Sequence, residues 1–158
     1  MPDYNHSFGG NRNNPYPKNN SRSSYVQPHE IFPQKVPDDY VDAAEKLMAR
    51  SSRFITTSKL RSLMSLASGV YNVENLRTEP QLLPESITQL NLMRMRTAYE
   101  CGRDFDVKNF VQNAHILNYL KWFSTDRPES RQDLINFYHY LEAIVAFHRY
   151  FGGKENRT

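Results

Sequence analysis

The sequence predicts an all-α protein, a compact bundle of about five helices preceded by a disordered N-terminal tail. From Pro37 onward, apolar residues recur every three to four positions, and no segment alternates apolar and polar residues long enough to form a strand. Before that point the chain is rich in Asn, Gly, Ser and Pro, with six Asn in its first 20 residues. A chain of 158 residues, 39% of them apolar, is long enough for one domain.

Composition divides the chain into three parts. Residues 1–36 cannot bury enough apolar surface to offset the entropy of ordering them, so we expect them to be disordered. Residues 37–153 carry the helical pattern and form the predicted domain. Residues 154–158 follow two consecutive glycines and are predicted to be a short C-terminal tail.

Two helices are predicted first. Asp38 can cap one that runs to about Arg50. Its inward residues are Tyr40, Ala44, Leu47 and Met48. Thr57 or Ser58 can cap the second. Its apolar residues follow the i, i+3, i+4, i+7 rule and are Leu60, Leu63, Met64, Ala67, Val70 and Tyr71.

The third helix is predicted to open at Ser86, with Gln89 as its capping-box partner, and to run to about Cys101 before Gly102. Its expected inward stripe is Leu92, Met95 and Tyr99.

Two more helices complete the prediction. Asp106 can cap a fourth that ends before Thr125, with Phe110, Val111, Ala114, Leu117 and Leu120 inward. The fifth opens at Ser130 and ends at Gly152-Gly153. Its wide apolar face predicts a central helix, with Leu134, Phe137, Leu141, Ile144, Val145 and His148 inward.

The sequence contains no recognisable catalytic or metal-binding motif. The five histidines and the single cysteine, Cys101, lack zinc-ligand spacing, and no nucleophile elbow, phosphate loop or dinucleotide motif is present. We therefore expect no cofactor, no metal and no enzymatic activity. Cys101 is interpreted as a small buried residue, His148 as a partly buried polar one, and Glu142 as a carboxylate that satisfies a helix end or an Arg. One cysteine and no apolar segment of membrane-spanning length indicate a cytoplasmic protein.

Charge is informative through its distribution. The formal net charge is +3, but the 16 basic and 15 acidic residues after position 36 leave the domain nearly neutral. Within it, an acid-free stretch from Lys46 to Val73 carries five basic residues, and Arg94 and Arg96 mark a second one. Arg53, Lys59 and Arg61 bracket the start of the second helix. There Thr57, Ser58 and free backbone N–H groups are expected to cradle a phosphate, although solvated helix faces are the alternative.

Three stretches resemble one known family in order and spacing. Residues 54–61 (FITTSKLR) are similar to the TTSxIR stretch of the small helical subunit of type III-A CRISPR–Cas effector complexes, the Csm complexes. Residues 96–103 (RTAYECGR) resemble its A-Y-x-x-G-R motif, and residues 140–153 (YLEAIVAFHRYFGG) resemble its E-A-I-V-A-Y-H-K-x-x-G terminus. The resemblance spans about Tyr40 to Gly153.

The resemblance implies a structural, non-catalytic subunit of an RNA-guided complex. Copies of such a subunit stack beside RRM-like backbone subunits and near the large polymerase-like subunit, and contact guide and target RNA through the backbone without reading bases. Lys59 and Arg61 lie in the first of these stretches, and Lys59 stands where relatives often have another polar residue. The residues indicated by the charge pattern and those in the family motifs together form the expected RNA-binding set. This set is Arg53, Ser58, Lys59, Arg61, Arg94, Arg96 and Arg103.

Alternatives remain open from the sequence. One alternative is a protein–protein scaffold whose basic face is merely solvated. Another is a helical hydrolase, although no catalytic pair can be assembled from the residues. The N-terminal tail mixes Tyr4, Tyr16 and Tyr25 with Arg12, Lys18 and Arg22, so it is either an RNA-touching arm or a passive linker.

Overall fold

The computed structural model describes residues 30–155, and these form six helices. Residues 1–29, for which we expect disorder, and residues 156–158 of the C-terminal tail lie outside the described residues. The helices are α1 (Tyr40–Ser51), α2 (Thr57–Glu74), α3 (Pro84–Arg103), α4 (Phe105–Asn113), α5 (Ile116–Trp122) and α6 (Ser130–Tyr150).

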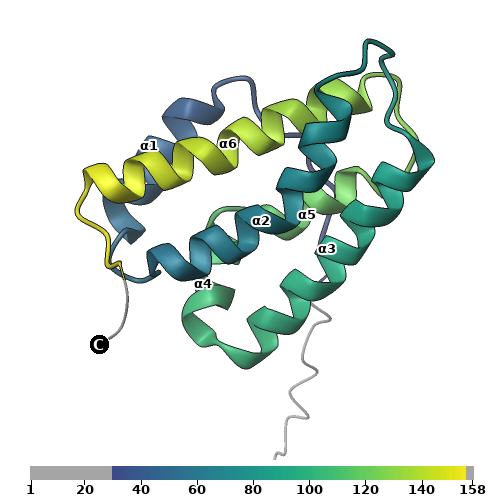
Figure 1. Ribbon diagram of the computed structural model, residues 1–158. Helices are drawn as coiled ribbons and strands as arrows, with labels where there is room; N and C mark the ends of the chain where they lie inside the picture. Colours follow the sequence, from purple (N-terminus) through teal and green to yellow (C-terminus); the bar gives the residue numbers. More distant parts are fainter. Residues whose placement is uncertain (1–29, 156–158) are drawn as a thin grey trace, which may run out of the picture.

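Helix α2 links the two sides of the bundle (Figure 1). On one side, α6 packs against α1 and α2; on the other, α3 packs against α2, α4 and α5. The core between them contains aromatic edge-to-face contacts: Tyr119 of α5 and Phe123, which directly follows α5, meet Phe137 of α6 with ring centroids 6.3 and 6.0 Å apart. The C-terminal end of α6 and the residues after it lie against the start of α2: the Lys154 carbonyl accepts the Thr57 N–H, and the His148 ring lies 2.7 Å from the Ile55 carbonyl.

The all-α prediction is confirmed, with no strand among residues 30–155, but the expected fourth helix is two. The break is at His115, whose φ of 58° is left-handed. The buried Tyr140 hydroxyl donates to the Ala114 carbonyl at 3.0 Å and so holds this carbonyl outside a continuous helix. Histidine tolerates this conformation better than most residues, and no Gly or Pro marks the site, so periodicity alone does not reveal the break.

Several predicted caps are wrong by one or two residues. Thr56, rather than Thr57 or Ser58, caps α2. Asp104, rather than Asp106, caps α4, accepting the N–H groups of Asp106 and Val107. Asp39, rather than Asp38, precedes α1, without a side-chain cap bond.

The predicted limits of α3 are also wrong. The helix begins at Pro84, with the pyrrolidine ring at its first position, where no N–H is needed. Ser86 lies buried within the first turn, and its hydroxyl donates to the Glu74 carboxylate at 2.6 Å instead of capping the helix. At the other end Gly102 lies inside the helix, which continues to Arg103.

The predicted inward stripe of α3 is wrong, because Leu92, Met95 and Tyr99 are exposed. The helix instead buries Ser86, Leu90, Met93, Thr97 and Cys101, a second face that also follows helical spacing. Sequence reasoning chose the larger aromatic and aliphatic residues. The packing of α2, α4 and α5 around α3 selects the face that carries the small Thr97 and Cys101.

Residues 30–36, placed by the sequence in the tail, contain a segment that lies along α5. The Gln34 N–H donates to the Asn118 carbonyl at 3.1 Å, and the Lys121 ammonium donates to the Ile31 carbonyl at 2.6 Å. Val36 is only 2% exposed and belongs to the core. The packed part of the chain therefore begins before Pro37.

A chain that begins at residue 37 is expected to be about 2 kcal/mol less stable than one that begins at residue 30. The loss is the transfer free energy of one buried valine, plus backbone hydrogen bonds to α5. Urea unfolding of the two truncated chains measures the difference. Superimposable curves would mean that residues 30–36 contribute nothing to the fold.

Candidate nucleic-acid interface

Backbone N–H groups at the N-terminus of α2 donate hydrogen bonds to acceptors within the protein. The Thr56 hydroxyl accepts the Lys59 N–H at 3.3 Å. The Lys154 carbonyl accepts the Thr57 N–H at 2.8 Å and the Thr57 hydroxyl at 3.2 Å. The N–H groups of Thr57 and Lys59 are expected from the sequence to be free to bind a phosphate. This expectation is wrong, because Lys154 and Thr56 accept hydrogen bonds from them.

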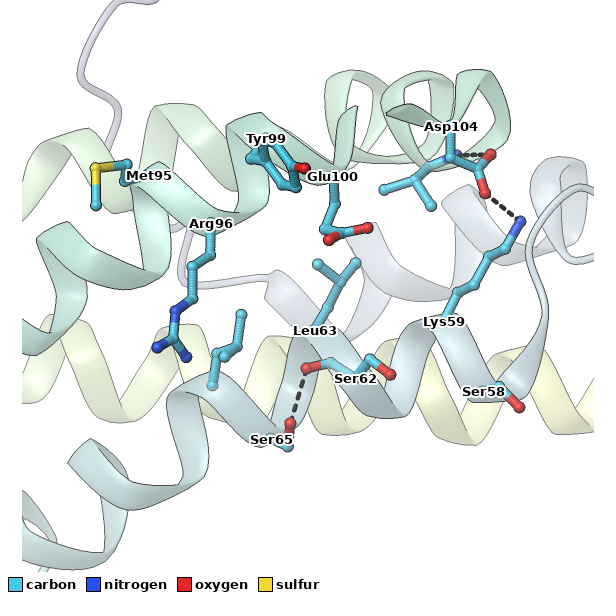
Figure 2. A pocket seen from close by; sticks show the side chains of 12 residues that line it. Ser58, Lys59, Ser62, Leu63, Ser65, Met95, Arg96, Tyr99, Glu100 and Asp104 are labelled. Carbon is cyan, nitrogen blue, oxygen red and sulfur yellow. Dashed lines mark hydrogen bonds and ion pairs between the residues drawn. The ribbon is translucent and has the colours of Figure 1, made fainter. Parts of the chain in front are cut away.

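A groove of about 850 Å³ separates α2 from α3 (Figure 2). We call it the α2–α3 groove. Leu63 and Val107 in its lining are buried, whereas Tyr99 and Met95 are exposed. Arg96 extends from α3 toward α2 (Figure 2). The complete lining is Ser58, Lys59, Ser62, Leu63, Ser65 and Leu66 of α2, Met95, Arg96, Tyr99 and Glu100 of α3, and Asp104 and Val107.

Lys59 crosses one end of the groove as a structural tie. Its ammonium lies 2.5 Å from the Asp104 carboxylate, the group that caps α4 (Figure 2). The hydrogen bond from Lys59 is the main reason that the pKa of Asp104 lies below its usual value. Much of the charge of Lys59 is thus neutralised by Asp104, an acidic residue that is distant in sequence. The stretch from Lys46 to Val73 contains no acidic residue, but in the folded protein an acidic side chain lies beside it.

Arg103 is partly neutralised as well. Its guanidinium lies 3.4 Å from the Glu100 carboxylate and 5.5 Å from the centroid of the Tyr99 ring, over one of its faces. Both charged side chains are largely exposed, so this pair contributes little to stability. Its effect is to place a cation beside an exposed aromatic ring at the groove.

Arg53, Arg61 and Arg96 are exposed and have no ion-pair partner in the described part of the chain. Arg61 lies with Thr57, Ser58 and Glu155 around a small hollow of about 130 Å³. Because Ser58 also lines the α2–α3 groove, this hollow and the groove adjoin. The guanidinium groups of Arg61, at the hollow, and Arg96, at the groove, therefore lie on neighbouring surfaces.

Arg94 is placed apart from the groove. Its side chain is half-buried on α3, and one guanidinium nitrogen is buried without a hydrogen-bond partner among residues 30–155. Of the seven predicted RNA-binding residues, Ser58, Lys59 and Arg96 line the groove and Arg61 adjoins it. Arg103 contacts the groove residue Tyr99, whereas Arg53 and Arg94 line neither hollow.

Sequence reasoning missed Tyr99 and Met95 as surface residues because it assigned them to the core. They are 66% and 64% exposed and lie four residues apart on the same face of α3. The signal that could have found them is the competing stripe through Leu90, Met93 and Thr97, which leaves the opposite face of the helix to solvent.

The other groups singled out in the sequence, Cys101, His148 and Glu142, do not line the groove. Burial raises the pKa of the Cys101 thiol, as expected for a small buried residue. The His148 ring, nearly fully buried, lies 2.7 Å from the Ile55 carbonyl, and Gly153 packs so closely on it that a Cβ would clash. Glu142 is exposed. Residues 30–155 contain no cluster of side chains suited to a metal ion, and none of their helices has the length and apolarity to cross a membrane.

The fold and this surface define a small all-α protein with a partly apolar groove between two helices, lined by two basic and two acidic residues. Residues 34–154 match the family model described as Csm2 Type III-A. A Streptococcus thermophilus protein named "CRISPR system Cms protein Csm2" is 32% identical over 124 residues, 75% of this chain and 95% of the relative. The protein of that name from Mycobacterium tuberculosis H37Rv is 31% identical over 76% of this chain and 97% of its own length. The chain belongs to the Csm2 family and is a small all-α subunit of a type III-A CRISPR (Csm) complex.

Proposed function

We propose that this subunit holds the backbones of guide and target RNA without sequence specificity, through cations at the start of α2 and on α3. The observation that carries the proposal is that Arg61 and Arg96, which are distant in sequence, line two adjoining hollows and have no ion-pair partner among residues 30–155. Unpaired guanidinium groups attract phosphates, and backbone contacts position an RNA without reading it.

In this proposal the subunit is non-catalytic and works in the cytoplasm. Several copies stack beside the RRM-like backbone subunits and the large polymerase-like subunit of the complex. Family membership supports the assembly, and base pairing between guide and target supplies the sequence recognition that the protein does not.

We expect the double variant Arg61→Ala/Arg96→Ala to bind unrelated single-stranded RNAs more weakly and to a similar degree. The slope of log affinity against log salt concentration should become shallower by about 0.7 per lost phosphate contact, because fewer counterions are released. Filter binding by the full chain at several salt concentrations measures both quantities. Lys59→Ala is a poorer test, since it also removes the ion pair to Asp104.

The matched control is Lys108→Ala, which removes an exposed cation from α4 outside the groove. It should leave the affinity and the salt slope close to those of the wild type. If the arginine double variant behaves like this control, RNA is not held at these cations.

One observation favours the alternative function, a protein–protein scaffold without direct RNA contact. Leu92, Met95 and Tyr99 expose apolar surface on one helix, as protein interfaces commonly do. In that case the arginine double variant would keep wild-type RNA affinity, and substitutions at Met95 would impair assembly of the Csm complex.

A further inference from the structure

Tyr99 combines exposure with a defined position. Its ring lines the α2–α3 groove, is 66% exposed and is covered over one face by the Arg103 guanidinium. Met95 lies one helical turn before it and is exposed to a similar extent. Neither side chain is needed to fill the core. An exposed aromatic ring held by an arginine is the kind of surface on which nucleobases stack.

The charges around the groove favour an anionic occupant. Four charged residues line it, and two of them, Lys59 and Asp104, neutralise each other. Glu100 is partly neutralised by Arg103. Arg96, three residues before Tyr99, is left without an ion-pair partner in the described chain. When Arg103, which lies beside the groove, is counted with the four charged lining residues, the formal charge is +1, and Arg61 adds a further positive charge past Ser58.

The apolar part of the lining suits the flat face of a base. Leu63 and Val107 are buried in the lining, and Leu66 and Met95 add aliphatic surface beside Tyr99. A backbone that follows Arg61 and Arg96 would pass along a surface with room for an unstacked base. An apolar protein side chain would fit the same lining but would gain no interaction with Arg96, whereas a phosphate beside the base would pair with it, so the charges favour RNA.

We propose that the α2–α3 groove receives an unstacked base of single-stranded RNA, which stacks on Tyr99 while Arg96 pairs with an adjacent phosphate. This inference rests on the proposed RNA-backbone function and adds a contact to the base. Any base can stack on an aromatic ring, so the contact keeps the binding independent of sequence.

The test uses the full chain and a short single-stranded RNA that carries aminopurine, a fluorescent adenine analogue quenched by stacking. Wild type and Tyr99→Phe should quench the fluorescence, because both keep an aromatic ring. Tyr99→Ala should lose the quenching and weaken binding between about fivefold and a hundredfold, the range found for one stacked base. Its salt slope should match the wild type, whereas that of Arg96→Ala should be shallower.

Two controls isolate the base. Tyr150→Ala removes an exposed tyrosine at the C-terminal end of α6, outside the lining of the groove, and should leave the quenching unchanged. With an abasic strand, wild type and Tyr99→Ala should bind equally, since no base is present to stack.

The outcomes separate this inference from the proposed function. If Arg96→Ala flattens the salt slope but Tyr99→Ala keeps wild-type affinity and quenching, the stacking inference is overturned and the backbone function stands. Loss of assembly with the other Csm subunits by a Tyr99→Ala variant that binds RNA normally would assign the groove to a protein partner, and would also overturn it. Absence of RNA binding by the wild type would overturn both.

Discussion

Glu74→Ala is expected to lower the free energy of unfolding by about 3–5 kcal/mol, the range found when one partner of a buried charge pair is removed. The Glu74 carboxylate is fully buried at the end of α2. It accepts hydrogen bonds from Arg77 and Ser86, both at 2.6 Å, and from the Leu83 N–H at 3.0 Å. These bonds fix the loop between α2 and α3, so alanine would leave three donors without this acceptor.

The effect should depend on pH in a defined direction. Burial raises the pKa of Glu74, but the hydrogen bonds from Ser86, Leu83 and Arg77 outweigh burial and lower it below the usual 4.5. Because the unfolded chain then binds the proton more readily, ionised Glu74 stabilises the fold above pH 4.5. This stabilisation is lost as the pH falls through the folded-state pKa.

Denaturant unfolding of wild type, Glu74→Ala and Glu74→Gln at several pH values tests both statements. The difference between wild type and Glu74→Gln should be largest near neutral pH and should shrink below about pH 4.5. Glu45→Ala, which removes an exposed carboxylate from α1, is the control and should change stability by less than about 0.5 kcal/mol. A gap that widens toward acid would contradict the assignment of an ionised, hydrogen-bonded Glu74.

Leu141→Ala is expected to cost about 2–5 kcal/mol of unfolding free energy, the usual range for emptying a packed core position. Leu141 is 4% exposed at the centre of α6, the helix that packs against both α1 and α2. Because those helices meet other neighbours as well, they have little freedom to close the cavity. Thermal or denaturant unfolding measures the loss.

The neighbouring Glu142 provides the comparison for this experiment. It is exposed on α6, so Glu142→Ala should stay within about 0.5 kcal/mol of the wild type. A loss below roughly 1 kcal/mol for Leu141→Ala would place that face of α6 at a surface instead of in the core.

The helical class, the family and most helix locations follow from the sequence because they depend on local patterns. The stripe from Leu60 to Val70 predicts α2, and α6 begins at Ser130 as expected and ends just before the paired glycines. The three family motifs are likewise local strings, and residues 34–154 match the family they indicate. Burial of Leu141 and His148 also follows from their spacing on one helix.

Other features depend on which residues meet in space. The break at His115 depends on Tyr140, which lies 26 positions beyond Ala114, and the exposure of Met95 and Tyr99 depends on which face of α3 its neighbours cover. Closure of the α2 N-terminus by Lys154 joins positions 97 residues apart. No local pattern contains such contacts.

The candidate site shows the same division. The sequence by itself determined an all-α member of the Csm2 family with its cations concentrated in two stretches, because composition and helical periodicity are carried by neighbouring residues. Only the tertiary structure decided which of these cations are paired: Lys59 pairs with Asp104, while Arg61 and Arg96 have no ion-pair partner among residues 30–155. The physical reason is that a charge is neutralised by whichever opposite charge lies within a few ångströms, and folding sets that distance.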